Sequence, residues 1–253
     1  MSRICAGVVA SMLCAAPAWG QSLAAPQPGP QPSVASLFRN LGHDVAQMPS
    51  RESALIVGLA TALSAATHHR DVEITASAAA NHPLDETLDA GAILGSGWVQ
   101  IGGALTTYII GRSKGHAQLA ETGADLVRAQ ILDGAITQVV KVAVDRPRPD
   151  GSRYSFPSGH TSSAFATAAV LERHYGWKAG LPAYAAAAYV GGSRLSENKH
   201  YLSDVIVGAA IGVVCGRATS IGSGRARMAV SPIAAPGGAG VEFTWLGRTP
   251  GGA

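Results

Sequence analysis

The sequence is poor in cysteine and in charge. Two of its three cysteines, Cys5 and Cys14, lie in the first twenty residues, and the rest of the chain keeps only Cys215, so no internal disulfide is expected there. The chain has 19 basic and 16 acidic residues. Without the first twenty residues, which contain Arg3, 18 basic residues remain against 16 acidic ones, a net charge of +2. So small a charge argues against a surface for nucleic acids or other polyanions. The histidines and cysteines also lack the spacing of metal ligands.

The first twenty residues have the layout of a secretory signal peptide. Arg3 is followed by an apolar run over 4–16 and by the small-x-small sequence Ala18-Trp19-Gly20. Residues 21–35, rich in proline and glutamine, are predicted to be a flexible leader after cleavage. We therefore expect an exported, periplasmic protein; the alternative is an integral inner-membrane protein whose active site faces the periplasm.

The body of the chain, residues 36–225, is predicted to be one helical domain. Six alanine-rich segments with little proline carry the helical signal: Glu52–Thr67, Leu88–Arg112, His116–Val144, Ser158–His174, Pro182–Ser196 and Ser203–Ala218. They predict an all-α fold, a compact bundle of about six helices. Residues 226–253 are predicted to form a short β-hairpin and a tail, because Val241, Phe243 and Trp245 alternate after a glycine-rich turn.

The sequence offers one long run without charge, Ala90–Gly111, which is long enough to span a bilayer. It contains six glycines and several polar residues, so its hydropathy is low and tight helix packing explains it equally well. Shorter apolar runs of 10–14 residues are more often buried core helices. We therefore expect a soluble or peripherally bound protein, with an integral bundle as the alternative.

Three short stretches carry the chemistry of this chain. The first, from Lys141 to Pro149, reads K-x6-R-P; the second, from Pro157 to His160, reads P-S-G-H; the third, from Ser193 to Asp204, reads S-R-x5-H-x3-D. Their candidate site residues are Lys141, Arg148, Ser158, Gly159, His160, Arg194, His200 and Asp204. Each stretch alone is a weak signal, because its residues could form an ordinary turn or helix cap. Their order and close spacing in one chain favour a functional site instead.

The cations and the glycine suit a phosphoryl group. A phosphoryl group in transfer spreads negative charge over three oxygens, so positioning and electrostatic stabilisation dominate its catalysis. Arg148 and Arg194 offer planar forks of donors, while Lys141 supplies a compact charge. Gly159 lets the backbone approach an oxyanion closely, and Ser158 adds a hydroxyl and a predicted helix N-cap. These five residues are expected to bind phosphate.

The two histidines suit nucleophilic and acid–base catalysis. Asp204 follows His200 by four residues, one helical turn, so its carboxylate is expected on the same face. There it would accept the imidazole Nδ1 proton and leave Nε2 free to attack phosphorus. His200 is then the predicted nucleophile. His160 is the predicted general acid and base, which protonates the departing oxygen and then activates water.

At every motif position the chain resembles the superfamily of type 2 phosphatidic acid phosphatases and vanadium haloperoxidases. The resemblance implies the same roles for His200, His160 and Asp204, and a metal-independent phosphatase with a phosphohistidine intermediate. It implies no cofactor, and vanadate as an inhibitor. The substrate is expected to be a small-molecule or lipid phosphate or pyrophosphate, because the superfamily contains both acid phosphatases and lipid phosphatases.

Two other functions stay open. A vanadate-dependent haloperoxidase would use the same cation pocket, although such enzymes usually carry additional helices. A non-catalytic envelope interaction protein would be expected to have lost part of the constellation.

Other charged residues near the motifs have ordinary explanations. Asp145 and Arg146 belong to what looks like a charged, proline-rich turn that ends a helix. His68 and His69, beside Arg70 and Asp71, are predicted to be a solvated helix end.

Overall fold

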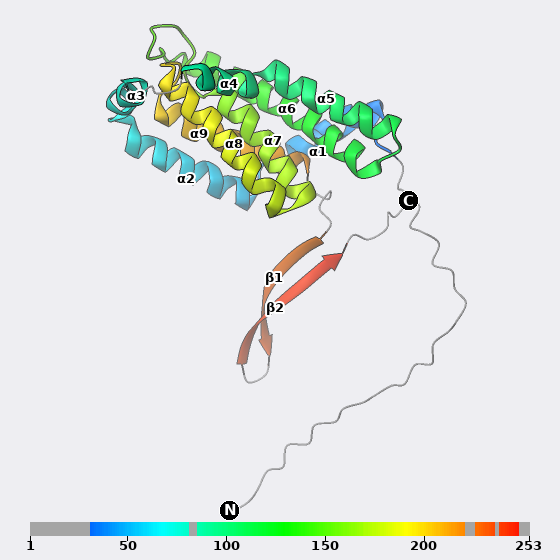
Figure 1. The fold of residues 1–253 in the computed structure, drawn as a ribbon. Coiled ribbons are helices and arrows are strands. Elements are labelled where there is room, and N and C mark those ends of the chain that lie inside the picture. Colours follow the sequence, from blue (N-terminus) through cyan, green and yellow to red (C-terminus); the bar gives the residue numbers. More distant parts are fainter. Residues whose placement is uncertain (1–30, 81–84, 221–225, 236–237, 248–253) are drawn as a thin grey trace, which may run out of the picture.

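The computed structural model describes residues 31–80 and 85–220, without the side chains of 85–89, and the backbone alone of 226–235 and 238–247. The predicted signal peptide, most of the leader and the tail lie outside these residues. The described part contains nine helices: α1 (Val34–Gln47), α2 (Arg51–His68), α3 (Asp71–Ala80), α4 (Asp85–Gly95), α5 (Gly97–Ser113), α6 (Ala117–Val144), α7 (Gly159–Tyr175), α8 (Trp177–Ser196) and α9 (Leu202–Thr219). The helical bundle is confirmed, with more helices than the six expected (Figure 1).

The additional helices have two sources. The segment predicted over Leu88–Arg112 is two helices, because Ser96 is extended and caps α5, accepting a hydrogen bond from the Val99 amide at 3.3 Å. The helices α1 and α3 were not predicted. The other segments agree within a few residues, except that α8 begins at Trp177, five residues before Pro182.

Close contact between α7 and α9 organises the centre of the bundle. Glycines recur at every fourth residue of α9 on the side that faces α7, and a Cβ at Gly212 would lie 2.1 Å from the Ser162 carbonyl oxygen. Only glycine permits so close an approach. The two helices start together, since the Ser158 amide donates to the Asp204 carbonyl oxygen at 3.0 Å. The glycines of α9 thus serve helix packing.

The bundle has two chemically distinct ends. At the first, which we call the site end, α6 finishes and α7 and α9 begin. At the second, the far end, α1 finishes, α2 begins and α9 finishes, as the ion pair between Glu52 and Arg217 shows. The helix α2 runs from the far end to the site end, where Asp71 contacts Ser203. In Figure 1 the loop between α6 and α7 marks the site end.

Beyond the bundle, two segments are assigned as antiparallel strands, β1 (Ala226–Ala235) and β2 (Gly238–Gly247), with Met228 opposite Trp245. They fall where the sequence predicts a hairpin. Their side chains are outside the described residues, so the alternation on which the hairpin rests is not tested and the hairpin stays a prediction.

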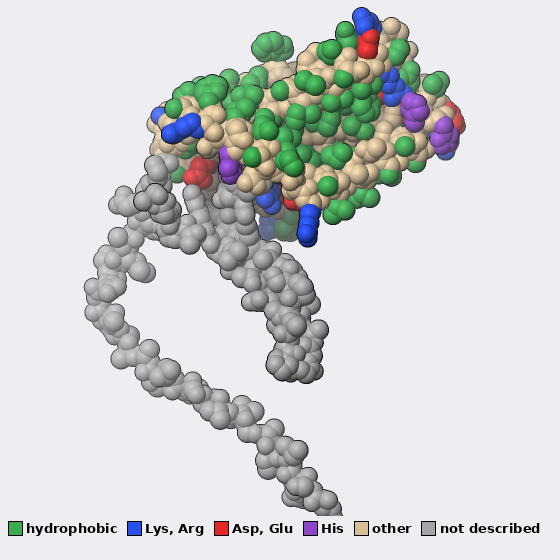
Figure 2. Space-filling view, turned by 180° about the vertical axis from the view of Figure 1, so that it is seen from behind, with side chains coloured by type: hydrophobic (Ala, Val, Ile, Leu, Met, Phe, Trp, Pro, Cys, Tyr) green, Lys and Arg blue, Asp and Glu red, His purple; other side chains and the backbone are tan. Residues whose placement is uncertain are grey.

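Many large apolar side chains are exposed on the outside of the bundle (Figure 2). They lie chiefly on α2, α5, α6 and α8: Leu55, Leu59, Leu63, Trp98, Leu105, Ile109, Ile110, Val139, Val142, Trp177 and Leu181. Within the described helices, α9 alone is long and apolar enough to cross a membrane, with a mean hydropathy of 1.5, and 56% of it is buried in the bundle. A core helix of a soluble protein has the same properties.

Candidate active site

All three motifs meet at the site end. Lys141 lies in the last turn of α6, Arg148 in the following loop, and Arg194 in the last turn of α8. Ser158 immediately precedes α7, and Gly159 and His160 open it. His200 lies just before α9 and Asp204 in its first turn. Four of these side chains interact electrostatically with His160: Arg194, His200, Arg148 and Lys141. The structure therefore brings the predicted site residues together.

His200 is buried beside Asp204. Its Nδ1 lies 3.7 Å from Oδ2 of Asp204, beyond hydrogen-bond distance, and has no hydrogen-bond partner. Catalytic hydrogen bonds are often long in the absence of substrate and shorten in the complex. Burial lowers the pKa of the His200 imidazole, an effect that Asp204 opposes and the charge of Lys141 reinforces. A lowered pKa favours the neutral imidazole, the form that acts as a nucleophile.

The carboxylate of Asp204 is fully buried and held from several sides. Its Oδ1 accepts from Arg146 Nη1 at 2.6 Å, and its Oδ2 accepts from the Tyr201 amide at 2.9 Å and from the Ser155 hydroxyl. The bond to the Tyr201 amide caps the start of α9. These contacts fix the position of the carboxylate relative to His200.

The cations differ in how they are held. Lys141 Nζ donates to the carbonyl oxygens of Tyr154, at 2.8 Å, and Pro157, at 2.6 Å. Arg148 has a buried Nε with no hydrogen-bond partner. Arg194 is buried and forms an ion pair with Glu197. Lys141 is thus anchored beside the start of α7, while Arg148 keeps a buried donor without an acceptor.

Ser158 and Gly159 lie where they were predicted, with one correction. Ser158 is at the N-cap position of α7, but its hydroxyl does not cap the helix. The buried serine hydroxyl instead forms a hydrogen bond with the Thr161 hydroxyl at 2.9 Å, and this bond takes the place of a cap. A Cβ at Gly159 would lie 3.7 Å from Lys141 Cε, which places this glycine directly beside the lysine.

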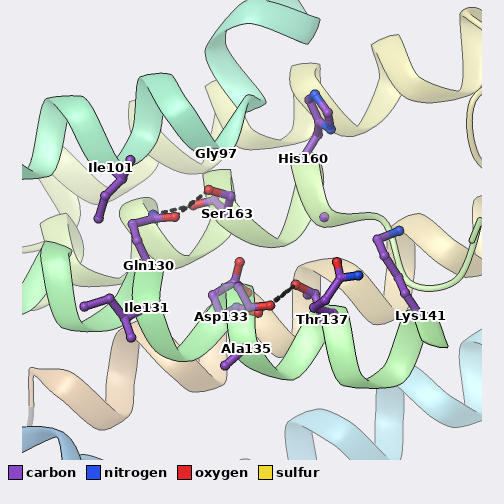
Figure 3. Close-up of a pocket in the computed structure, with 13 residues that line it drawn as sticks. Gly97, Ile101, Gln130, Ile131, Asp133, Ala135, Thr137, Lys141, His160 and Ser163 are labelled. Carbon is purple, nitrogen blue, oxygen red and sulfur yellow. Dashed lines mark hydrogen bonds between the residues drawn. The ribbon is translucent and has the colours of Figure 1, made fainter. Parts of the chain in front are cut away.

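A cavity of about 470 Å³ opens beside His160, between α5, α6 and α7. Lys141, Gly159 and His160 line one part of it, and Figure 3 shows His160 and Lys141 on the same side of the opening. The opposite part is lined by Ile101 and Ile131. The cavity therefore joins Lys141 and His160 to an apolar wall.

Asp71 and Arg146 belong to the site end although sequence reasoning gave them ordinary explanations. The solvated helix end predicted at His68 and His69 is confirmed, since both are exposed, but the neighbouring Asp71 is 1% exposed and pairs with Arg146. Arg146 is likewise no surface turn residue, since it contacts both Asp71 and Asp204. Apart from the neighbouring His68, the partners of Asp71 lie 75 and 132 residues away, so no local pattern could reveal them. Among the residues that the structure describes, no three histidine, cysteine or acidic side chains group as metal ligands.

Comparison with known proteins finds a matching family model and a curated relative. Residues 150–227 match the PAP2 superfamily. A protein of Porphyromonas gingivalis described as "Lipid A 1-phosphatase" is 36% identical over 110 residues. That alignment covers 42% of this chain and 24% of the relative, so the chain spans about a quarter of the relative's length.

Two solved structures are also similar. Aquifex aeolicus LpxE aligns with a TM-score of 0.51 and 26% identity, over 59% of this chain and 93% of that one. A transmembrane PAP2 type phosphatidylglycerolphosphate phosphatase from Bacillus subtilis aligns with a TM-score of 0.49 and 22% identity, over 73% of this chain and 92% of that one.

The matched range contains the second and third motifs, with His160, Arg194, His200 and Asp204, and begins just after Lys141 and Arg148. The resemblance predicted from the motifs is therefore confirmed as a match of residues 150–227 to the PAP2 superfamily.

Proposed function

We propose that this chain is a phosphatase that hydrolyses lipid phosphates through a phosphohistidine formed on His200. The observation that carries the proposal is the buried pair of His200 and Asp204 at the convergence of Lys141, Arg148 and Arg194. Cations that converge on a neutral, oriented imidazole meet the two needs of phosphoryl transfer, charge stabilisation and a nucleophile. The similarity to a protein described as a lipid A phosphatase supports the same reaction class.

In the first step, Nε2 of His200 attacks phosphorus and the bond from phosphorus to the leaving oxygen breaks. The Nδ1 proton moves towards the Asp204 carboxylate, which stabilises the charge that develops on the imidazole. His160 donates a proton to the leaving oxygen, so that the alcohol departs neutral. The products of this step are the alcohol and a phosphohistidine.

In the second step, His160, now a base, takes a proton from water as the water oxygen attacks phosphorus. The bond from phosphorus to Nε2 breaks, which returns His200 to its neutral form and releases inorganic phosphate. Lys141, Arg148 and Arg194 neutralise the equatorial oxygens in both steps. The proposal assigns no step to a metal ion or a cofactor.

The exterior of the bundle supports a lipid substrate. Two exposed tryptophans lie at opposite ends: Trp98 begins α5 near the cavity, and Trp177 begins α8 near the far end. Between them the surface carries exposed leucine, isoleucine and valine side chains. Tryptophans at both ends of an apolar belt are typical of proteins embedded in a bilayer. We therefore propose the integral membrane alternative, in which the site end meets the lipid headgroups.

The test is an assay of the full chain, purified in detergent, on a soluble phosphomonoester, phosphatidic acid, a lipid A phosphate and a polyprenyl diphosphate. We expect release of phosphate from the lipid substrates, inhibition by vanadate, and a ³²P label on His200 after an acid-free quench. Turnover of soluble monoesters alone, by protein that alkaline carbonate washes from membranes, would contradict the lipid and membrane proposals.

The same preparation distinguishes the other functions. Halide oxidation with vanadate and peroxide, without phosphate release, would indicate a haloperoxidase. Absence of both activities in folded protein would favour a non-catalytic role. The acid role of His160 has its own signature: His160→Ala should form the phosphohistidine from p-nitrophenyl phosphate, whose leaving group is weakly basic, but not from an alkyl phosphate.

A further inference from the structure

A buried chain of charges extends from the catalytic carboxylate away from the substrate side. Arg146 bridges Asp204, at 2.6 Å, and Asp71, at 2.9 Å. Asp71 is 1% exposed and Asp204 is fully buried. We call these three residues the Asp71–Arg146–Asp204 bridge. The bridge links Asp204 to α3, a helix that lies outside the range matched by the family model.

The guanidinium of Arg146 is committed to this bridge. Its Nη1 donates to Oδ1 of Asp204 and, at 2.7 Å, to the Ser203 hydroxyl, while its Nη2 donates to Asp71. Its plane lies over the Tyr201 ring, with the guanidinium carbon 4.2 Å from the ring centroid. Three hydrogen bonds and a stacking contact fix the orientation of the fork. Arg146 therefore acts on Asp204 and is not itself aimed at a phosphate.

Asp71 holds the arginine and the start of α9 together. Its Oδ2 accepts from Arg146 and from the Ser203 hydroxyl, and its Oδ1 accepts from the Ser203 amide at 3.0 Å. A single side chain of α3 thus sets both the arginine and the first turn of α9, which carries Asp204. Displacement of Asp71 would move both.

We propose that Arg146 and Asp71 are positioning residues for the reaction at His200. Arg146 occupies Oδ1 of Asp204, which leaves Oδ2 directed towards Nδ1 of His200. It also keeps Asp204 an anion, as the carboxylate must be to receive the imidazole proton. Asp71 supplies the counter-charge that holds Arg146 in place. The inference rests on the proposed function, since it assigns these residues to that same site.

The competing explanation is that Arg146 and Asp71 only stabilise the fold. A similar cluster at the far end provides the control for this explanation. There Arg128 bridges Asp44, at 2.5 Å, and Asp125, at 2.8 Å, and its side chain is more deeply buried than that of Arg146. Loss of either bridge disturbs a buried ion network. Only loss of the site-end bridge should change the chemical step.

The experiment compares Arg146→Lys with Arg128→Lys in the full chain in detergent, with kcat, KM and thermal unfolding measured for each on phosphatidic acid. For Arg146→Lys we expect kcat to fall about 10- to 100-fold with KM within about twofold, a loss similar to that for residues that orient a metal ligand. Arg128→Lys should unfold at a lower temperature and keep kcat. Asp71→Asn should resemble Arg146→Lys, and guanidinium ions should restore part of the kcat lost in Arg146→Ala.

The outcomes separate this inference from the proposed function. If the wild-type chain hydrolyses the lipid and His200→Ala does not, but folded Arg146→Lys and Asp71→Asn keep the wild-type kcat, the positioning role alone is overturned. A rise in KM without a fall in kcat would also overturn it, because it would make Arg146 a phosphate ligand. Failure of the wild type to hydrolyse any phosphate would overturn both proposals.

Discussion

The two ends of the bundle use almost the same set of residues for different purposes. At the site end, Arg146 bridges Asp71 and Asp204, and Asp204 adjoins His200. At the far end, Arg128 bridges Asp44 and Asp125, and Asp125 pairs with His174 at 2.8 Å. Each end thus joins an arginine, two aspartates and a histidine that is nearly inaccessible to solvent.

The difference lies in what surrounds each histidine. His174 already has its hydrogen bond to Asp125, and Arg128 also donates to the Thr219 carbonyl oxygen at 2.7 Å. His200 keeps Nδ1 unpaired and feels the charges of Lys141 and Arg148. A buried Asp–His pair alone is therefore compatible with a structural role. Convergent cations around an unsatisfied imidazole distinguish a site for an anion.

The sharpest test of this comparison is to remove each histidine. His200→Ala should reduce hydrolysis to background, because loss of a catalytic nucleophile costs about 10⁶-fold in rate. His174→Ala should retain the kcat of the folded fraction, since His174 lies at the opposite end of α7. Phosphate release per folded molecule, measured after size exclusion, checks both. Background activity in both variants would mean that the two ends are coupled.

Replacing the partner aspartates should separate chemistry from stability. Asp204→Asn should lower kcat by about 10²- to 10⁴-fold with little change in KM, because it disturbs the tautomer and orientation of His200. Asp125→Asn should instead lower the free energy of unfolding by about 3 kcal/mol, the cost of breaking a buried ion pair. Steady-state kinetics and thermal unfolding of both variants give the comparison. A binding defect alone in Asp204→Asn would argue against its assigned role.

Two arginines of the loop between α6 and α7, Arg148 and Arg153, allow a matched comparison with a smaller expected effect on activity. Arg148→Lys should lower kcat/KM by about 10²-fold although it keeps the charge, since a point charge does not reproduce two parallel hydrogen bonds. Arg153→Lys, five residues away in an exposed ion pair with Asp145, should be close to wild type. Equal losses in both variants would show that the loop, and not the Arg148 fork, is what matters.

The pH dependence of kcat/KM should report the shift at His200. Because burial lowers the pKa of His200 below the ordinary value of 6.5, the neutral nucleophile persists at a pH where an exposed histidine is already protonated. Activity should therefore fall on the acidic side only at a pH below that at which an ordinary histidine titrates. Lys141→Met, which removes a nearby positive charge, should move this limb to higher pH. A limb that stays in place would exclude His200 as its origin.

The smallest expected effect is that of chelation. Excess chelator should leave the rate unchanged if Lys141, Arg148 and Arg194 neutralise the phosphate. Vanadate, which mimics the five-coordinate transition state, should inhibit and raise the unfolding temperature of the wild type and of Arg128→Lys, but not of His200→Ala. Loss of activity with chelator and its return with a divalent ion would refute the metal-independent mechanism.

The sequence predicted what depends on local patterns. The long helices follow from alanine-rich segments between glycine and proline, and the motif residues were expected together because their spacing resembled a family. The break at Ser96 was missed, because one serine cap interrupts an otherwise continuous helical pattern. The site-end bridge was missed for another reason: Asp71 and Arg146 are charged residues next to turns, and their burial depends on contacts across 75 residues.

The course of α2 has a consequence for the sidedness of the enzyme. This helix starts beside Arg217 at the far end and finishes beside Ser203 at the site end. If α2 crosses a bilayer, α1 lies at one face of the membrane and His200 lies at the other. Cleavage of a signal peptide at residue 20 would leave Gln21 and α1 outside the cytoplasm, and the active site would face inward.

A periplasm-facing site requires the reverse, with the far end in the cytoplasm and the first twenty residues never cleaved. The N-terminal residue of the purified protein thus reports which compartment supplies the substrate.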